Sequence, residues 1–198
     1  MVINEKFLLS AGAEVKEYNS GDIIFYEGST PYHYYQISKG KVKLNNYNKE
    51  GKELIQKIIT EGESVGESLL FTEKPYPMDA IALESCSILR LCRNNFFSML
   101  KIYPQLYFDL CKCLSDCLYY QYVMLEANSS RSPSERIIGV LDYLKDSKKD
   151  QSQFSFKIPF TRQQLASITG LCVETAIRAI KDMEKKKIVR IKNRKIYF

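Results

Sequence analysis

Residues 161–170 read TRQQLASITG, and a second helical pattern follows at once, from Leu171 to about Lys186. The first stretch is typical of a short capped helix that ends at Gly170, and a glycine at that point supplies a tight turn between two helices. Ala166 is small, as is required where a second helix packs closely. These features predict a helix-turn-helix unit.

The second of these helices has two distinct faces. Apolar residues recur with helical spacing on one face, at Ala176, Ile177, Ile180 and Met183. The opposite face carries Glu174, Thr175, Arg178 and Lys181. Recognition helices contact bases near their N-terminal ends, arginine matches guanine O6 and N7, and glutamate accepts from cytosine N4. We therefore predict base contacts for Glu174 and Arg178; the alternative is a surface ion pair four residues apart.

The residues around this unit predict a winged helix-turn-helix domain over 129–198. After it, the runs 188–191 and 195–198 flank Lys192, Asn193 and Arg194, which indicates a hairpin with a cationic tip. Before it, Ser132 to Glu135 combine a capping box with a proline at the first helical position, so a helix begins there. We expect residues 145–153 to form a loop and Phe154–Phe160 to form a strand.

The charge is divided unevenly along the chain. The net charge of +6 comprises −3 over residues 1–128 and +9 over residues 129–198. Lysine and arginine neutralise phosphates and release counterions, so a basic C-terminal third is typical of a nucleic-acid-binding module joined to another domain. Double-stranded DNA is the expected partner of that third.

Short β-type runs separated by glycines occupy residues 12–92. Period-two alternation is clear in residues 41–44 and 87–91, and Gly21 and Gly28 bracket the run Ile23–Tyr26. Many short strands at this spacing indicate an antiparallel roll or sandwich. The predicted fold is α+β: an antiparallel β-roll of the double-stranded β-helix or jelly-roll type over 1–102, a long dimerisation helix over 103–128, and the winged helix-turn-helix.

The dimerisation helix is predicted from a glycine-free segment that Pro104 can open. Its spacings of three and four match the seam of a coiled coil. The seam, and hence the expected homodimer interface, comprises Leu106, Leu110, Cys113, Cys117, Tyr120 and Met124. A second stripe at Leu114, Leu118 and Leu125 leaves another flank apolar, so that one flank can pack on the roll and the other on a second subunit.

Six cysteines occur in a chain with no signal-like N-terminus and no apolar run of membrane-spanning length. We expect free thiols, a cytoplasmic bacterial protein and no membrane partner. Cys111, Cys113 and Cys117 leave a thiol or metal redox sensor open as an alternative, but cysteine also packs as a small apolar residue. We predict no metal site, and the single histidine, His33, lies among tyrosines, so haem is not expected.

With these motifs in hand, the chain resembles the Crp/Fnr superfamily of bacterial transcription regulators along nearly its whole length. The resemblance rests on residues 21–28 (GDIIFYEG), 37–44 (ISKGKVKL), Gly66-Glu67 before 69–71 (LLF), and 161–166 (TRQQLA). Valine before Glu174-Thr175 is closer to the anaerobic Fnr branch than to the cyclic-AMP branch. The resemblance implies an inverted-repeat DNA site read by a homodimer, with RNA polymerase as a further expected partner.

The resemblance also implies roles for single residues. Glu174 and Arg178 match the base-reading positions. The expected DNA-backbone contacts are Thr161, Arg162, Gln163, Cys172, Thr175, Lys181, Lys192, Asn193 and Arg194. The expected effector pocket comprises Gly66, Glu67, Ser68, Met78, Asp79, Gln121 and Tyr122. The effector itself is not identified by the sequence.

Two departures from the family pattern reduce the number of effectors and cofactors to be expected. Cyclic-AMP-binding relatives place an Arg-Ser pair against the cyclic phosphate, whereas the matching segment here, 76–79, reads YPMD. Each lost charge-assisted bond forfeits about 1.5–3 kcal/mol, and Asp79 repels a phosphate, so cyclic AMP is not expected to bind. No cysteine precedes Cys86, so the N-terminal iron–sulfur cluster of the oxygen-sensing branch is not expected either.

Two other functional classes, a hydrolase and a regulatory module that does not bind DNA, agree less well with the sequence. Residues 62–66 (GESVG) match the G-x-S-x-G pattern of hydrolases, but that motif needs a strand-to-helix turn in an α/β sheet and a histidine later in the chain, while His33 precedes Ser64. We therefore predict no enzyme and no catalytic residues. A regulatory module that acts only through protein contacts would have no need of Glu174, Arg178 or a cationic wing.

Overall fold

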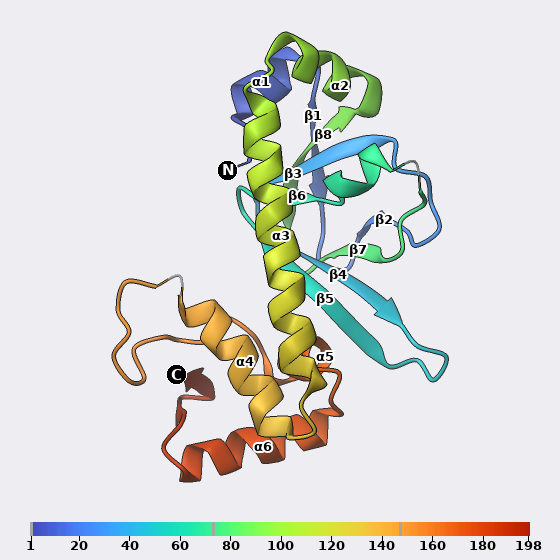
Figure 1. The fold of residues 1–198 in the computed structure, drawn as a ribbon. Coiled ribbons are helices and arrows are strands. Elements are labelled where there is room, and N and C mark those ends of the chain that lie inside the picture. Colours follow the sequence, from blue (N-terminus) through green and yellow to red (C-terminus); the bar gives the residue numbers. More distant parts are fainter. Residues whose placement is uncertain (1, 73, 147) are drawn as a thin grey trace. The chain divides into compact units, whose positions relative to one another are not determined.

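The computed structural model describes residues 2–72, 74–146 and 148–198 (Figure 1). The chain divides into two compact units, Met1–Cys117 and Leu118–Phe198. The division falls inside the 24-residue helix α3 (Leu106–Ser129), within the segment that the sequence assigns to dimerisation. Among the described residues, no helix is both long and apolar enough to cross a bilayer.

The first unit is built around two four-stranded antiparallel sheets, as the glycine-punctuated runs predict. One sheet has the strand order β1 (Glu14–Tyr18), β8 (Cys86–Cys92), β3 (His33–Lys39) and β6 (Ser64–Val65). The other has the order β2 (Ile23–Phe25), β7 (Asp79–Ala82), β4 (Lys41–Tyr47) and β5 (Glu53–Thr60). Apolar residues of both sheets form one shared core, so the two sheets together make the predicted roll.

Helices cover the outer side of the first sheet. Alternate residues of β3 point to opposite faces, so Tyr35 and Ile37 join the core between the sheets while Tyr34 joins a second core. That second core also contains residues of α1 (Glu5–Ser10), η1 (Glu67–Phe71), α2 (Arg93–Ile102) and the first turns of α3. Pro104 lies in the turn between α2 and α3 and does not open the long helix, which begins two residues later.

Two glycines of the roll are required by close packing. At Gly66, φ is +69°, and an added Cβ would lie 2.8 Å from the Tyr76 ring. At Gly40, φ is +98°, and a Cβ would lie 2.7 Å from the carbonyl oxygen of Ser85. Left-handed backbone and lack of space therefore both select glycine at these two turns.

The second unit contains α4 (Pro133–Asp146), α5 (Arg162–Ile168), α6 (Val173–Lys185), β9 (Arg190–Lys192) and β10 (Lys195–Tyr197). Pro133 is the first residue of α4, as predicted. The expected capping box is half formed: Ser132 Oγ accepts from the Glu135 N–H at 3.4 Å, but the Glu135 carboxylate accepts from the Ser130 hydroxyl.

Two predictions for the segment after α4 are wrong. Lys145, expected in the loop, lies in the last turn of α4, where its buried ammonium donates to Ser152 O at 2.9 Å. The strand expected over Phe154–Phe160 is reduced to an isolated bridge between Lys157 and Tyr197. Phe154 has φ +64°, and this left-handed residue prevents a continuous strand.

Candidate nucleic-acid interface and thiol cluster

The buried face of α6 is the one that the sequence predicts. Ala176, Ile180 and Met183 are each at most 1 % exposed, Ala179 adds to them, and Ile177 is half-buried. The helix begins at Val173 with Cys172 as its N-cap, slightly later than expected. Because this face anchors the helix in the unit, the opposite face is available to a partner.

Glu174 and Arg178 are exposed on that opposite face. Arg178 Nη2 donates to Thr175 Oγ1 at 3.4 Å, and the described residues contain no ion pair between Glu174 and Arg178. The arrangement therefore does not favour the ion-pair alternative. Thr175 is half-buried and Lys181 is exposed.

The predicted backbone contacts before α6 come from α5 and its cap. Thr161 caps α5: its hydroxyl accepts from the Gln164 N–H at 3.1 Å, and the Gln164 side chain accepts from the Thr161 N–H at 2.8 Å. Gln163 is exposed on the first turn, and Cys172 is exposed at the start of α6. Gly170, with φ +65°, makes the tight turn between the helices, as the sequence predicts.

The wing is a two-stranded hairpin in which Lys192 pairs with Lys195. Its turn residues, Asn193 and Arg194, both have positive φ, at 48° and 61°, as a two-residue hairpin turn with matching twist requires. Arg162 Nη1 donates to Arg194 O at 3.4 Å, so the start of α5 holds the wing tip. Lys192, Asn193 and Arg194 are exposed, and the expected cationic tip is present.

Two side chains connect the helix-turn-helix to the end of α3 within the second unit. Asn128 Nδ2 donates to Ile168 O at 3.2 Å, and Arg136 Nη1 donates to Thr169 O at 3.3 Å. Arg136 also donates from Nε to Ser130 O at 2.6 Å. These bonds satisfy carbonyls at the C-terminal end of α5, which have no partner inside that helix.

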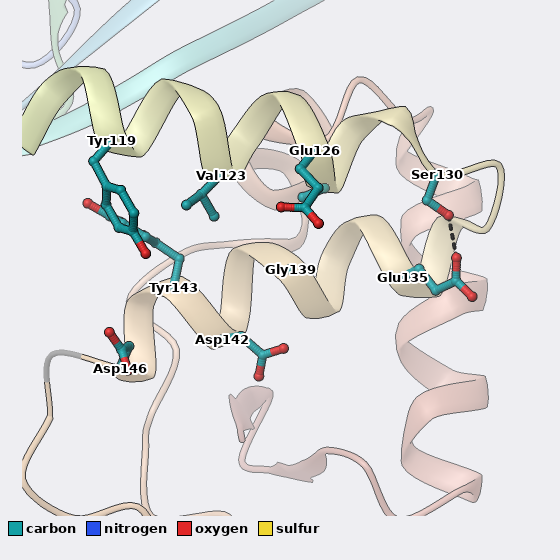
Figure 2. A pocket seen from close by; sticks show the side chains of 10 residues that line it. Tyr119, Val123, Glu126, Ser130, Glu135, Gly139, Asp142, Tyr143 and Asp146 are labelled. Atoms are coloured by element: carbon teal, nitrogen blue, oxygen red, sulfur yellow. Dashed lines mark hydrogen bonds between the residues drawn. The ribbon is translucent and has the colours of Figure 1, made fainter.

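A groove of about 500 Å³ lies between α3 and α4 (Figure 2). Gly139 permits the close approach of the two helices, because an added Cβ would lie 2.6 Å from the Ala127 Cβ. The titratable carboxylates that line the groove are Glu126, Glu135, Asp142 and Asp146. Burial raises the pKa of Asp142. An acidic lining of this kind repels phosphates, so the groove is not part of a DNA-binding surface.

Four of the six residues of the predicted dimer seam are already buried within their own unit. Leu106 and Leu110 are buried in the second core of their own roll, at 3 % and 1 % exposure. Tyr120 is buried too and packs edge-to-face on Tyr143 with ring centroids 5.1 Å apart, and Met124 is 6 % exposed. Cys113 and Cys117 are half-buried, and their sulfurs lie close to the Glu67 carboxylate. The seam pattern identified a buried face, but that face is covered by the same chain.

Five residues of the predicted effector pocket belong to the roll unit, and Gln121 and Tyr122 belong to the other unit. Glu67 is buried, Ser68 is exposed, and Met78 packs on the roll core. The Asp79 carboxylate accepts from the Glu27 N–H at 2.7 Å. Gln121 and Tyr122 are exposed on the α3 segment of the other unit. Between the sheets, Phe25 stacks on Tyr76 with ring centroids 3.7 Å apart, so aromatic side chains fill this part of the roll.

Glu67, Cys113 and Cys117 form a cluster that the sequence does not predict. The carboxylate of Glu67 and the thiols of Cys113 and Cys117 have ligating atoms within 4.8 Å of one another. Cys113 Sγ lies 3.9 Å from Glu67 Oε1 and 3.5 Å from Ser64 Oγ, and Lys57 Nζ lies 3.7 Å from Cys117 Sγ. Cys111, which belongs to the predicted triplet, is exposed and outside the cluster.

The two thiols titrate differently. A hydrogen bond from Cys113 lowers the pKa of Cys117 to about 7, and the charge of Lys57 acts in the same direction against burial. The same bond, burial and the Glu67 charge raise the pKa of Cys113. Of the two thiols, Cys117 therefore ionises at the lower pH, and Cys113 is its hydrogen-bond donor. The spacing of one helical turn was visible in the sequence, but the proximity of Glu67, 46 residues earlier, was not.

The position of Ser64 does not agree with the hydrolase interpretation. Ser64 lies on β6, which pairs antiparallel with β3, and not at a turn from a strand into a helix of an α/β sheet. The structure gives Ser64 Oγ a contact with a cysteine thiol. The pattern of glycines around Ser64 serves turns of the roll.

Comparison with known proteins agrees with this architecture. Residues 15–103 match the cyclic nucleotide-binding domain family, and residues 135–198 match the Crp-like helix-turn-helix domain family. The HTH-type transcriptional regulator ArcR of Staphylococcus epidermidis is 27 % identical over 179 residues, which cover 88 % of this chain and 77 % of that protein. The transcriptional activator protein FnrA of Stutzerimonas stutzeri is 25 % identical over 178 residues, covering 89 % and 72 %.

A solved structure has the same fold. The c-di-GMP-responsive global regulator CLP of Xanthomonas campestris superposes with a TM-score of 0.80 at 19 % identity, covering 98 % of this chain and 96 % of that one. A roll of the cyclic nucleotide-binding type joined to a Crp-like helix-turn-helix defines a DNA-binding transcription regulator. The chain belongs to the Crp/Fnr superfamily, as the sequence motifs indicate. Both of these relatives are transcription regulators.

Proposed function

We propose that the chain acts as a homodimer on an inverted-repeat DNA site, with Glu174 and Arg178 reading base edges in the major groove. The observation that carries this proposal is the geometry of α6, whose buried face anchors it while these two side chains project from its first turns. The half-sites should lie about one helical turn, ~10 bp, apart.

The surrounding polar residues are assigned to the DNA backbone. Thr161, Gln163 and Cys172 are exposed at the helix starts, and the wing presents Lys192, Asn193 and Arg194. Arg162, Thr175 and Lys181 complete this proposed set. Most such contacts position a protein on the duplex and carry little sequence information, so they should act on all sequences alike.

Substitution of Arg178 separates base reading from general attraction. Arg178→Ala should weaken binding to the cognate site by about 1–3 kcal/mol and relax the preference for one G·C pair. Lys185→Ala is the matched control, because Lys185 is an exposed cation in the last turn of the same helix and pairs with Asp182 at 3.6 Å. Fluorescence anisotropy on cognate and scrambled duplexes measures both. Equal losses on the two duplexes would place Arg178 among the backbone contacts.

The second subunit is proposed to cover an exposed stripe of α3. Phe108, Cys111, Ser115, Leu118, Tyr122 and Leu125 follow one another at alternating steps of three and four residues, and all are exposed. Phe108 and Leu125 are 78 % and 73 % exposed. A parallel copy of the same helix presents an identical stripe at the same level, as a two-fold interface requires.

Sedimentation equilibrium tests this interface. Leu125→Glu should convert a dimer into a folded monomer, because two carboxylates would meet in an apolar seam. Gln121→Glu adds the same charge to the same helix outside the stripe and should leave the dimer intact. A wild-type monomer at micromolar concentration, or a dimer that survives Leu125→Glu, would refute the stripe as the interface.

The proposal extends to the effector, the cellular compartment and the protein partner. The Asp79 carboxylate and the aromatic filling between the sheets support the expectation that cyclic AMP is not the effector. Six free cysteines suit the reducing cytoplasm, and RNA polymerase is the protein partner we expect at a promoter.

A further inference from the structure

The roll unit contains a buried carboxylate beside two thiols. Glu67 is 5 % exposed, and its side-chain contact among the described residues is the 3.9 Å approach of Cys113 Sγ. A buried carboxylate is costly unless a cation or strong donors compensate it. Lys57, the nearby ammonium, hydrogen-bonds to Glu63 Oε1 at 3.0 Å and lies 3.7 Å from Cys117 Sγ.

We propose that Glu67, Cys113 and Cys117 form a binding site for a thiophilic divalent cation of the Zn²⁺ class. Their ligating atoms already lie within 4.8 Å of one another. In a tetrahedral zinc site with bond lengths of about 2.3 Å to sulfur and 2.0–2.2 Å to oxygen, such atoms are roughly 3.5–3.8 Å apart. Small rotamer changes of side chains on α3 and η1 therefore suffice to close the site.

The kind of donor selects the cation. Two sulfurs and one carboxylate are soft enough for Zn²⁺, whereas Mg²⁺ and Ca²⁺ take oxygen ligands. An iron–sulfur cluster needs about four thiolates, and the cluster offers two. With both thiols deprotonated, the three ligands carry three negative charges. A divalent cation neutralises two of them, and the Lys57 ammonium, which also pairs with Glu63, lies 3.7 Å from the Cys117 sulfur.

An opening lies beside the two thiols. A cavity of about 330 Å³ reaches Cys113 and Cys117 and is also lined by Lys57, Gly62 and Lys112. Water or a small ligand can therefore complete the tetrahedron from outside. Ser64 Oγ, 3.5 Å from Cys113 Sγ, is placed to hydrogen-bond to a bound thiolate from the inner side.

The proposal is tested with reduced, chelator-treated full-length protein, titrated with Co²⁺ as a spectroscopic probe and with Zn²⁺ against a chromophoric chelator. We expect one ion per chain, a thiolate-to-cobalt charge-transfer band, and displacement of cobalt by zinc. Cys113→Ser and Cys117→Ser should each reduce zinc affinity about 100-fold or more, and Glu67→Gln about 10- to 100-fold with the charge-transfer band kept. Cys92→Ser, at an exposed cysteine of the roll that lies outside the cluster, should change nothing.

A second measurement needs no variant and so does not depend on how a substituted chain folds. Zinc should protect Cys113 and Cys117 of the unmodified protein from alkylation, while the exposed Cys92 reacts at the same rate with and without the ion. No zinc binding at micromolar concentration, equal protection of Cys92, or zinc binding that survives both cysteine exchanges would overturn the proposal. Metal binding is measured without DNA, so its outcome is independent of the proposed DNA contacts.

Discussion

Helices α3 and α6 each bury an apolar face, but that face is covered in different ways. In α6, Ala176, Ile180 and Met183 pack into a small unit formed by residues close in sequence. In α3, Leu106 and Leu110 pack into a core that also draws on α1, η1 and β8. The face of α3 offset by two residues, from Phe108 to Leu125, is the one left exposed.

This difference between α3 and α6 shows what the spacing of apolar residues can predict. A stripe at steps of three and four predicts that a helix face is buried, and this was true of both helices. It does not identify the covering element. In α6 the remaining face is polar, so the partner-facing side follows by elimination. In α3 both faces carry apolar residues, and elimination fails.

The largest expected effect distinguishes the two faces of α3. Leu110→Ala should lower the free energy of unfolding by about 2–5 kcal/mol, since a fully buried leucine leaves a cavity. Leu125→Ala is the matched exchange on the exposed stripe. Urea unfolding followed by tyrosine fluorescence measures both, because the chain has no tryptophan.

The dependence on protein concentration then separates core from interface. The loss caused by Leu110→Ala should persist at every concentration, whereas the loss caused by Leu125→Ala should vanish on dilution as the dimer dissociates. If the Leu110 effect also vanished on dilution, Leu110 would belong to the subunit interface after all and the original seam would be restored.

The second prediction concerns the thiols on the inner side of α3. In metal-free protein, alkylation of Cys117 should rise as the pH passes about 7, because the hydrogen bond from Cys113 and then the charge of Lys57 stabilise its thiolate. An unperturbed thiol is only a few per cent ionised at pH 7, so the expected gain in thiolate there is roughly tenfold. Peptide-resolved mass spectrometry gives the profile.

Cys113→Ala removes the donor and should move the Cys117 profile to higher pH. Cys92→Ala, at an exposed cysteine of the roll, is the control that should leave the profile unchanged. A Cys117 profile that ignores Cys113 would show that the two thiols of α3 do not interact in solution.

The candidate sites depend on local features and on contacts between residues far apart in the sequence. Only the local features can be predicted from the sequence. Gly170, Thr161 and the Asn193-Arg194 turn are local signals, because caps and turns are set by neighbouring residues. The Glu67–Cys113 contact joins residues 46 positions apart, so it depends on how α3 packs against η1. The strand predicted over Phe154–Phe160 is cut short by the left-handed backbone of Phe154, and only the residues around Lys157 bond to the end of the chain.

The third prediction tests how firmly the end of α3 is tied to the helix-turn-helix. Arg136 donates to Ser130 O and Thr169 O, so Arg136→Ala should lower the stability of the second unit by about 1.5–3 kcal/mol, the usual contribution of hydrogen bonds from a charged group. Arg131→Ala, at an exposed arginine of the same connection, should have little effect. Hydrogen exchange of α5 amides reports the local opening; equal exchange in both variants would show that the tie is dispensable.

The smallest effect is expected at the wing, and it sharpens the contrast with α6. Lys192 is exposed on β9 and pairs through the backbone with Lys195, so its ammonium is free to meet a phosphate without holding the fold. Lys192→Ala should weaken cognate and scrambled duplexes by the same factor and reduce the slope of log K against log salt by about one, because one fewer counterion is released. Lys149→Ala removes an equal charge from the exposed segment after α4 and serves as control. Anisotropy titrations at four salt concentrations measure the slopes. A sequence-dependent loss for Lys192→Ala would make the wing a base reader, and the division of work between the recognition helix and the wing would have to be redrawn.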